Sequence, residues 1–119
     1  MSVTIATRQI GDVTILDVAG RIQLGEGAIS LRNALRDLMT NNRAKILLNL
    51  GDVTYIDSSG MGELVTGFTS MANRGGQLKL LNVTKRVKDL LQITKLYTVF
   101  DVHETEASAL RSFSATASA

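Results

Sequence analysis

Residues 45–68, K-I-L-L-N-L-G-D-V-T-Y-I-D-S-S-G-M-G-E-L-V-T-G-F, carry the clearest structural signal of the chain. The apolar run at 46–50 is short enough for a strand and continuous enough for one that is buried on both faces. A turn is expected at 51–53, and apolar residues then recur at helical spacing, which predicts a helix over 59–73. The polar segment 57–62 therefore lies where a strand passes into a helix N-terminus, a place that favours anions.

The rest of the chain supplies alternating strands and helices around this unit. Two β-rich segments on either side of Gly11 predict an adjacent strand pair, and a loop is expected at 21–27. The expected elements are strands at 3–7 and 13–18, a helix at 28–39, the central strand and helix, a strand at 77–82, a short helix after Thr84, a strand at 96–102 and a helix at 104–113.

This order of elements predicts an α/β fold. We expect a mixed, mostly parallel sheet of four to five strands covered by helices. One domain is expected over residues 1–113, and a frayed tail over 114–119, where the residues are small and polar. The composition agrees with one domain, since 119 residues with 45% hydrophobic residues suffice for a single core.

Composition also excludes several classes of function. A net charge of +2 with 4% aromatic residues does not predict direct contact with nucleic acid. The absence of cysteine excludes disulfide, thiol and zinc-finger chemistry. No run approaches the roughly 20 apolar residues of a membrane span, and no signal peptide is recognisable. We therefore expect a soluble, cytoplasmic protein without a membrane partner.

Enzymatic chemistry has little support in the sequence. A serine nucleophile needs a base beside it, and the single histidine, His103, is far from Ser58 in the chain and is interpreted as a surface residue at a helix start. G-x-S-x-G is absent. A small enzyme that uses Ser58 as nucleophile stays open as a third hypothesis, and ester hydrolysis assays would distinguish it. Our prediction is that the protein is not an enzyme.

Metal and phosphate motifs are also weak. Asp52 and Asp57 are the nearest approach to a cluster of metal ligands, and Gly25 and Gly27 lack the third glycine of a dinucleotide-binding loop. No metal and no cofactor are expected. The basic cluster of Lys85, Arg86 and Lys88 is interpreted as a solvated helix face in which Lys85 pairs with Asp89, with contact to an acidic partner surface as the alternative.

The segment 57–62 has two interpretations. In the simpler one, Asp57, Ser58 or Ser59 is an ordinary helix N-cap. In the other, Gly60 and Gly62 indicate a functional role for the segment, because each glycine destabilises a helix by about 1 kcal/mol relative to alanine. Acceptance of this cost in the first helical turn is interpreted as keeping the backbone accessible to a partner.

The sequence 49–62 resembles the signature of bacterial anti-sigma factor antagonists, in the STAS domain family. The family pattern is an apolar strand, Asn-Leu, a few residues, and then aromatic-x-Asp-Ser-(Ser/Thr)-Gly-(Leu/Met)-Gly, which corresponds here to 55–62. The resemblance covers nearly the whole chain. It implies the STAS fold and a non-enzymatic role in which binding to a partner is regulated.

In this family the serine after the aspartate is phosphorylated by an anti-sigma factor that is also a serine kinase, and a PP2C-type phosphatase reverses the reaction. That serine corresponds to Ser58. The unphosphorylated form binds the anti-sigma factor and thereby releases the sigma factor. The resemblance places partner contacts around this serine, at Arg21, Gln23, Asp57, Ser59, Gly60, Met61 and Gly62.

The loop after the second strand departs from the family pattern. It often reads Gly-x-(Leu/Ile)-Asp, and here it is Gly20-Arg21-Ile22-Gln23. Some family members are not phosphorylated and act as interaction modules, including subunits of lipid transporters. A STAS adaptor in a larger assembly is therefore the alternative function.

Overall fold

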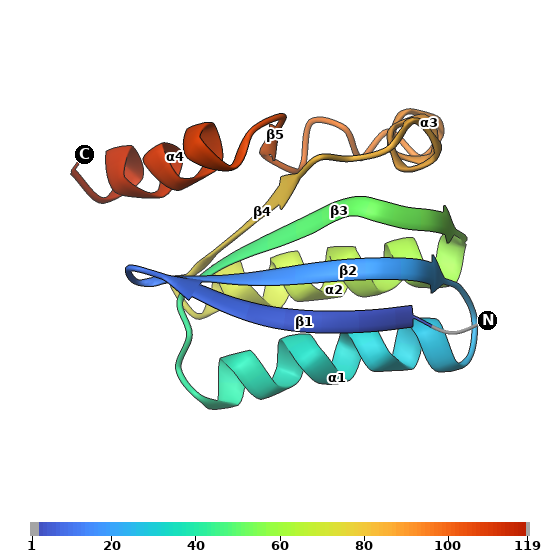
Figure 1. Ribbon diagram of the computed structural model, residues 1–119, viewed down its shortest axis with the longest axis horizontal. Helices are drawn as coiled ribbons and strands as arrows, with labels where there is room; N and C mark the ends of the chain where they lie inside the picture. The colour runs from blue at the N-terminus through green and yellow to red at the C-terminus, as the bar shows by residue number, and fades with distance from the viewer. Residues whose placement is uncertain (1–2, 119) are drawn as a thin grey trace.

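The computed structural model describes residues 3–118 and shows a five-stranded sheet with four helices in that range (Figure 1). The strands are β1 (Val3–Ile10), β2 (Val13–Ile22), β3 (Lys45–Ile56), β4 (Gln77–Leu81) and β5 (Val102–His103). The helices are α1 (Glu26–Thr40), α2 (Ser58–Asn73), α3 (Lys85–Ile93) and α4 (Glu106–Ser118).

The sheet is mixed and mostly parallel, as the sequence predicts. Its strand order is β1-β2-β3-β4-β5, with β1 antiparallel to β2 and every other neighbouring pair parallel. The carboxyl ends of β2 and β3 therefore lie side by side, next to the N-termini of α1 and α2 (Figure 1). Loops at the carboxyl ends of parallel strands are where open α/β sheets bind ligands.

Two apolar clusters fill the opposite faces of the sheet. Neighbouring residues of a strand point to opposite faces, and Leu16 and Leu48 belong to one cluster while Ile15 and Leu47 belong to the other. The larger cluster joins the sheet to α1 and α2 and extends to α3. The smaller one holds α4 against the sheet through Ala109 and Phe113.

The pairing of β2 with β3 continues further than the sequence predicts. Both strands run on to a register pair of Ile22 with Ile56, so the expected turn at 51–53 and the start of the expected loop at 21–27 are wrong. The register shifts between Asp17 and Ala19 and between Gly20 and Arg21, and β3 has one extra residue at each shift. Such bulges let a strand continue through residues that read locally as a turn.

The last strand and helix also differ from expectation. β5 contains only Val102–His103, because the chain from 96 to 101 makes turns in which Phe100 is buried edge-on against the ring of Phe68, 5.4 Å away between centroids. Helix α4 starts at Glu106 and its backbone continues to Ser118, past the expected end at 113. Ala119, at the end of the expected tail, lies outside the described residues.

Candidate functional site

The carboxylate of Asp57 fixes the N-terminus of α2. Its Oδ1 accepts a hydrogen bond of 2.9 Å from the backbone N–H of Gly60, which makes Asp57 the N-cap. Its Oδ2 accepts another of 2.9 Å from the backbone N–H of Leu24, in the loop between β2 and α1. Burial alone would raise the pKa of this carboxyl, but the hydrogen bonds from Leu24 and Gly60 outweigh it and lower the pKa. Asp57 thus joins the loop to the helix.

Ser58 is the first residue of α2, and its side chain is exposed. The next residue, Ser59, is half-buried. Because Asp57 supplies the cap, the simpler interpretation of the segment is correct for Asp57 and leaves Ser58 without a capping role. The Ser58 hydroxyl is therefore presented to solvent at a helix end whose backbone is held in place.

Gly60 and Met61 lie on the inner side of this turn. A Cβ atom on Gly60 would overlap the carbonyl oxygen of Ile22 and come within 2.9 Å of Ile56 Cγ1. Met61 is 2% exposed and belongs to the larger apolar cluster. These two residues, expected at the partner surface, serve the packing of α2 on β2 and β3, and the part of that expectation that concerns a partner stays a prediction.

Gly62 lies on the outer side. It is exposed, and a Cβ built on it meets nothing within 4 Å. The fold therefore does not require glycine there, in contrast to Gly60. The space beside Gly62 is open to an approaching backbone.

Arg21 and Gln23 lie beside each other where β2 passes into the loop. Arg21 Nη2 donates a hydrogen bond of 3.3 Å to Gln23 Oε1, and its guanidinium lies 4.7 Å from the ring centroid of Tyr55, its register partner on β3. Arg86 of α3 lies over the same ring at 4.4 Å. Tyr55 appeared in the sequence only as the aromatic residue of the family pattern, and Arg86 only as a member of the basic cluster.

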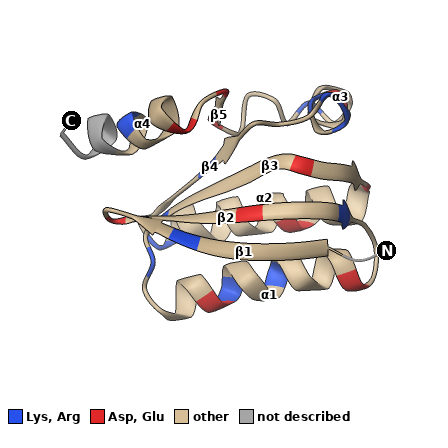
Figure 2. Cartoon of the chain, viewed as in Figure 1, with Lys and Arg blue, Asp and Glu red and all other residues tan. Residues whose placement is uncertain are grey.

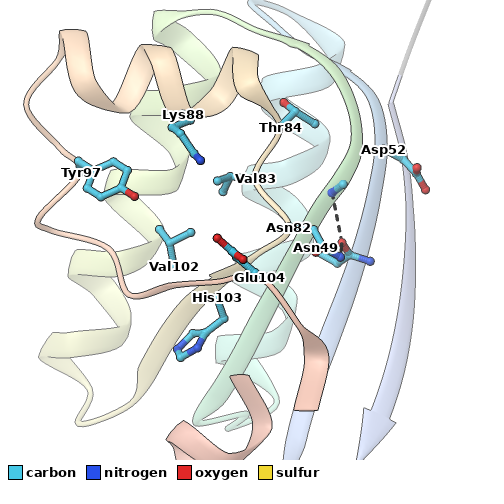
Figure 3. Close-up of a pocket in the computed structure, with 11 residues that line it drawn as sticks. Asn49, Asp52, Asn82, Val83, Thr84, Lys88, Tyr97, Val102, His103 and Glu104 are labelled. Atoms are coloured by element: carbon cyan, nitrogen blue, oxygen red, sulfur yellow. Dashed lines mark hydrogen bonds between the residues drawn. The ribbon is translucent and has the colours of Figure 1, made fainter. Parts of the chain in front are cut away.

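A cavity of about 650 Å³ lies between α3, the middle of β3, the segment after β4, and β5 (Figure 3). None of the residues expected to bind the partner lines it. Figure 3 shows the side chains of Lys88 and Glu104 directed into the hollow while His103 points away from it. The lining residues are Asn49, Gly51, Asp52, Asn82, Val83, Thr84, Lys88, Tyr97, Val102, His103 and Glu104.

His103 and Ser58 lie on different elements, β5 and α2. His103 is half-buried in β5, so its interpretation as a surface residue at a helix start is wrong. Its Nδ1 lies 3.0 Å from Ser108 Oγ and its Nε2 lies 3.0 Å from Asp101 Oδ2. Within the described residues no hydrogen bond joins His103 to Ser58, and no group of acidic or histidine side chains could hold a metal ion.

The expected ion pair on α3 is confirmed. Lys85 Nζ lies 2.8 Å from Asp89 Oδ2, one helical turn away. Both side chains are exposed and solvent screens their attraction, so the contact is a feature of a solvated face. Of the described helices, none is both long enough and apolar enough to cross a membrane.

Comparison with known families now adds to this geometry. The family model of the STAS domain matches residues 4–109, nearly the whole chain. The chain belongs to the STAS domain family. No protein of curated function matches the sequence significantly.

Solved structures agree with this assignment. A Thermotoga maritima protein, TM1081, described as an anti-sigma factor antagonist, is 26% identical with a TM-score of 0.85, over 91% of this chain and 92% of that one. An anti-sigma factor antagonist from Mycobacterium paratuberculosis is 17% identical with a TM-score of 0.83, over 92% of each chain. The phosphorylated form of Bacillus SpoIIAA is 16% identical with a TM-score of 0.73, over 92% of this chain and 99% of that one. The last two likenesses show the fold.

Proposed function

We propose that this STAS domain is an anti-sigma factor antagonist whose binding to an anti-sigma factor is switched off by phosphorylation of Ser58. The single observation that carries the proposal is the exposed Ser58 hydroxyl on a helix N-terminus fixed by Asp57. A kinase can reach such a hydroxyl without unfolding the chain. The resemblance to TM1081, itself described as an anti-sigma factor antagonist, supports the same role.

The proposed partners follow from this cycle. An anti-sigma factor with serine kinase activity binds the unphosphorylated form and modifies Ser58, and a PP2C-type phosphatase restores the hydroxyl. The contacts centre on Ser58, Ser59 and Gly62, with Arg21 and Gln23 beside them. The protein itself carries out no reaction, works in the cytoplasm and binds neither nucleic acid nor membrane.

The direct test is incubation of the protein with the kinase and ATP, followed by mapping of the modified residue by mass spectrometry. We expect one phosphate, on Ser58. Ser58→Ala should remain unmodified and bind the kinase constitutively, while the matched variant Ser59→Ala should still be modified on Ser58. Phosphate on Ser59, or on neither serine, would contradict the proposal.

A STAS adaptor without a phosphorylation cycle is the second candidate. Gln23 favours it, because family members that are phosphorylated often have an aspartate at this position. Gln23 instead accepts a hydrogen bond from Arg21. Stable co-purification with transporter subunits, together with a Ser58 that no kinase modifies, would decide for the adaptor.

The third hypothesis, a serine hydrolase, is not favoured, because among the described residues no hydrogen bond joins His103 to Ser58. Ester hydrolysis by the wild-type protein should equal that of Ser58→Ala. A rate that depends on Ser58 would reopen the question of enzymatic activity.

A further inference from the structure

Leu24 is an apolar side chain that the fold holds out into solvent. It is 77% exposed, in a loop that is hydrogen-bonded to the N-cap residue of α2. Its backbone N–H donates to Asp57 Oδ2 over 2.9 Å, and the carbonyl of the preceding Gln23 accepts a hydrogen bond of 2.9 Å from Ala28. The peptide unit between Gln23 and Leu24 is therefore fixed through both of its polar groups, and binding through Leu24 costs little further ordering of the backbone there.

The arginine pair on Tyr55 lies beside this loop. Arg21 at the end of β2 and Arg86 on α3 both lie over the ring, at 4.7 and 4.4 Å from its centroid. Figure 2 shows basic residues at the end of β2 and on α3. Among the residues whose side chains are described, 3–113, no carboxylate lies within ion-pair distance of either guanidinium.

Stacking on an aromatic ring leaves a guanidinium able to bind an anion. The ring contacts the flat face of the group, while its N–H donors point outward in the plane and match a carboxylate in two parallel hydrogen bonds. Two such groups over one ring fix two positive charges close together. Their electrostatic complement is a surface that carries negative charge.

Arg21 connects the two features, since it lies over Tyr55 and donates to Gln23, the neighbour of Leu24. We infer that Leu24 and the cluster of Arg21, Tyr55 and Arg86 form one docking surface beside Ser58. Its occupant is the anti-sigma factor, which presents an apolar pocket for Leu24 bordered by carboxylates that face the two arginines. This inference rests on the proposed function and adds the chemistry of the partner.

The chain offers matched controls for both features. Ile93, at the far end of α3, is 77% exposed, the same fraction as Leu24. Lys88 is an exposed cation on the same helix as Arg86, without an ion pair among the described residues. Replacing Ile93 or Lys88 changes exposed hydrophobicity or net charge as much as the test variants do, but away from the proposed surface.

The test uses the purified serine kinase that transfers phosphate from ATP to Ser58, titrated with the unphosphorylated protein at 50 and 300 mM salt. Leu24→Asn should weaken binding at least tenfold, and Ile93→Asn should stay within twofold. Arg86→Gln should weaken binding about tenfold at low salt and less at high salt, Arg86→Lys should recover only part of this loss, and Lys88→Gln should stay within twofold. Thermal melts establish that each variant is folded.

The outcomes distinguish a failure of the proposed docking surface from a failure of the proposed function on which it rests. If the kinase binds the unphosphorylated wild type no more tightly than the phosphorylated form, the proposed function fails and the surface with it. If the wild type binds and both Leu24→Asn and Arg86→Gln bind equally well, the function stands and the surface is wrong. Equal losses in the test and control variants, or a loss in Arg86→Gln that salt does not change, would also overturn it. Self-association that Leu24→Asn abolishes would assign the surface to a second copy of the chain.

Discussion

The first turn of α2 has an inner side that packs against the sheet and an outer side that is exposed to solvent. On the inner side, Gly60 leaves room for the carbonyl of Ile22, and Met61 is buried in the apolar core. On the outer side, Ser58 and Gly62 are exposed, and nothing in the fold contacts the place of a Gly62 side chain. Two glycines only two residues apart thus have separate explanations, one in folding and one, by our proposal, in binding.

The largest effect should come from Gly60→Ala. The new methyl group meets a backbone oxygen, which cannot move away as a flexible side chain could, so α2 must shift from β2. Overpacking of this kind costs about 1–3 kcal/mol, and we expect about 3 kcal/mol here because the neighbour is backbone. Chemical denaturation measures the loss. Gly62→Ala is the matched control and should be as stable as the wild type or up to about 1 kcal/mol more stable. Equal losses in the two variants would contradict the division between the two sides.

Phosphorylation of Ser58 should act on binding and not on folding. The phosphate adds about −1.5 to −2 charges at neutral pH, favoured by the helix N-terminus by about 0.3–1 kcal/mol and disfavoured by Asp57 by about as much. At the interface the phosphate must lose water, and a buried unpaired charge costs several kcal/mol. We expect at least a hundredfold loss of affinity and a melting shift below about 5 °C, roughly 1 kcal/mol for a domain of this size.

Titration of the kinase and a thermal melt, both on the phosphorylated protein, check this balance. Ser58→Asp should also bind weakly. A larger melting shift with unchanged affinity would mean that the phosphate acts on the fold, and the proposed switch would be wrong.

Gly62→Val should weaken binding to the anti-sigma factor at least tenfold, about 1.4 kcal/mol, while the fold survives. The space around Gly62 accepts the side chain in the free protein, but a β-branched residue there obstructs an approaching backbone. Affinity by titration and stability by denaturation decide the point together. If the affinity changes less than about threefold, close approach is not the reason for glycine at this position.

The sequence predicts the sheet, the helices and the position of Ser58 well, because these depend on local periodicity and on one recognisable motif. Leu64 and Ser58 illustrate this, one buried at a helical spacing and the other exposed at the helix start. The extension of β3 was missed because Gly51 and Asp52 read locally as a turn, whereas pairing with β2 keeps them in the strand. Strand ends are set by a partner strand that is distant in sequence.

The candidate site likewise depends on contacts between residues that are distant in sequence. By sequence, Asp57 is one of three candidate caps of α2, and the bond from its other oxygen to Leu24 depends on how the loop returns to the helix. Likewise, Arg86 meets Tyr55 only through the packing of α3 beside β3. The roles of Gly60 and Gly62 could not be separated by sequence, since both are glycines in one helical turn and only the neighbouring Ile22 distinguishes them.

The smallest effect is expected from Asp57→Asn. This variant tests the hydrogen bonds by which Asp57 joins the loop between β2 and α1 to the first turn of α2. Asparagine can still cap α2 through its oxygen, but its amide nitrogen faces the Leu24 N–H, so one hydrogen bond, worth about 1 kcal/mol, is lost at pH 7.

Because folding lowers the pKa of Asp57 below its ordinary 3.8, the stabilisation is present above that value and disappears as the pH falls through the lower, folded pKa. The difference in unfolding free energy between wild type and variant should therefore be constant from pH 7 to about 5 and shrink below about 4. The other carboxyls with lowered pKa values, Asp12, Asp17 and Asp101, are common to both proteins and cancel in the difference. Denaturation curves of both proteins across this range measure it, and a difference that stays constant or grows in acid would show that the Asp57 carboxylate does not hold the loop to the helix.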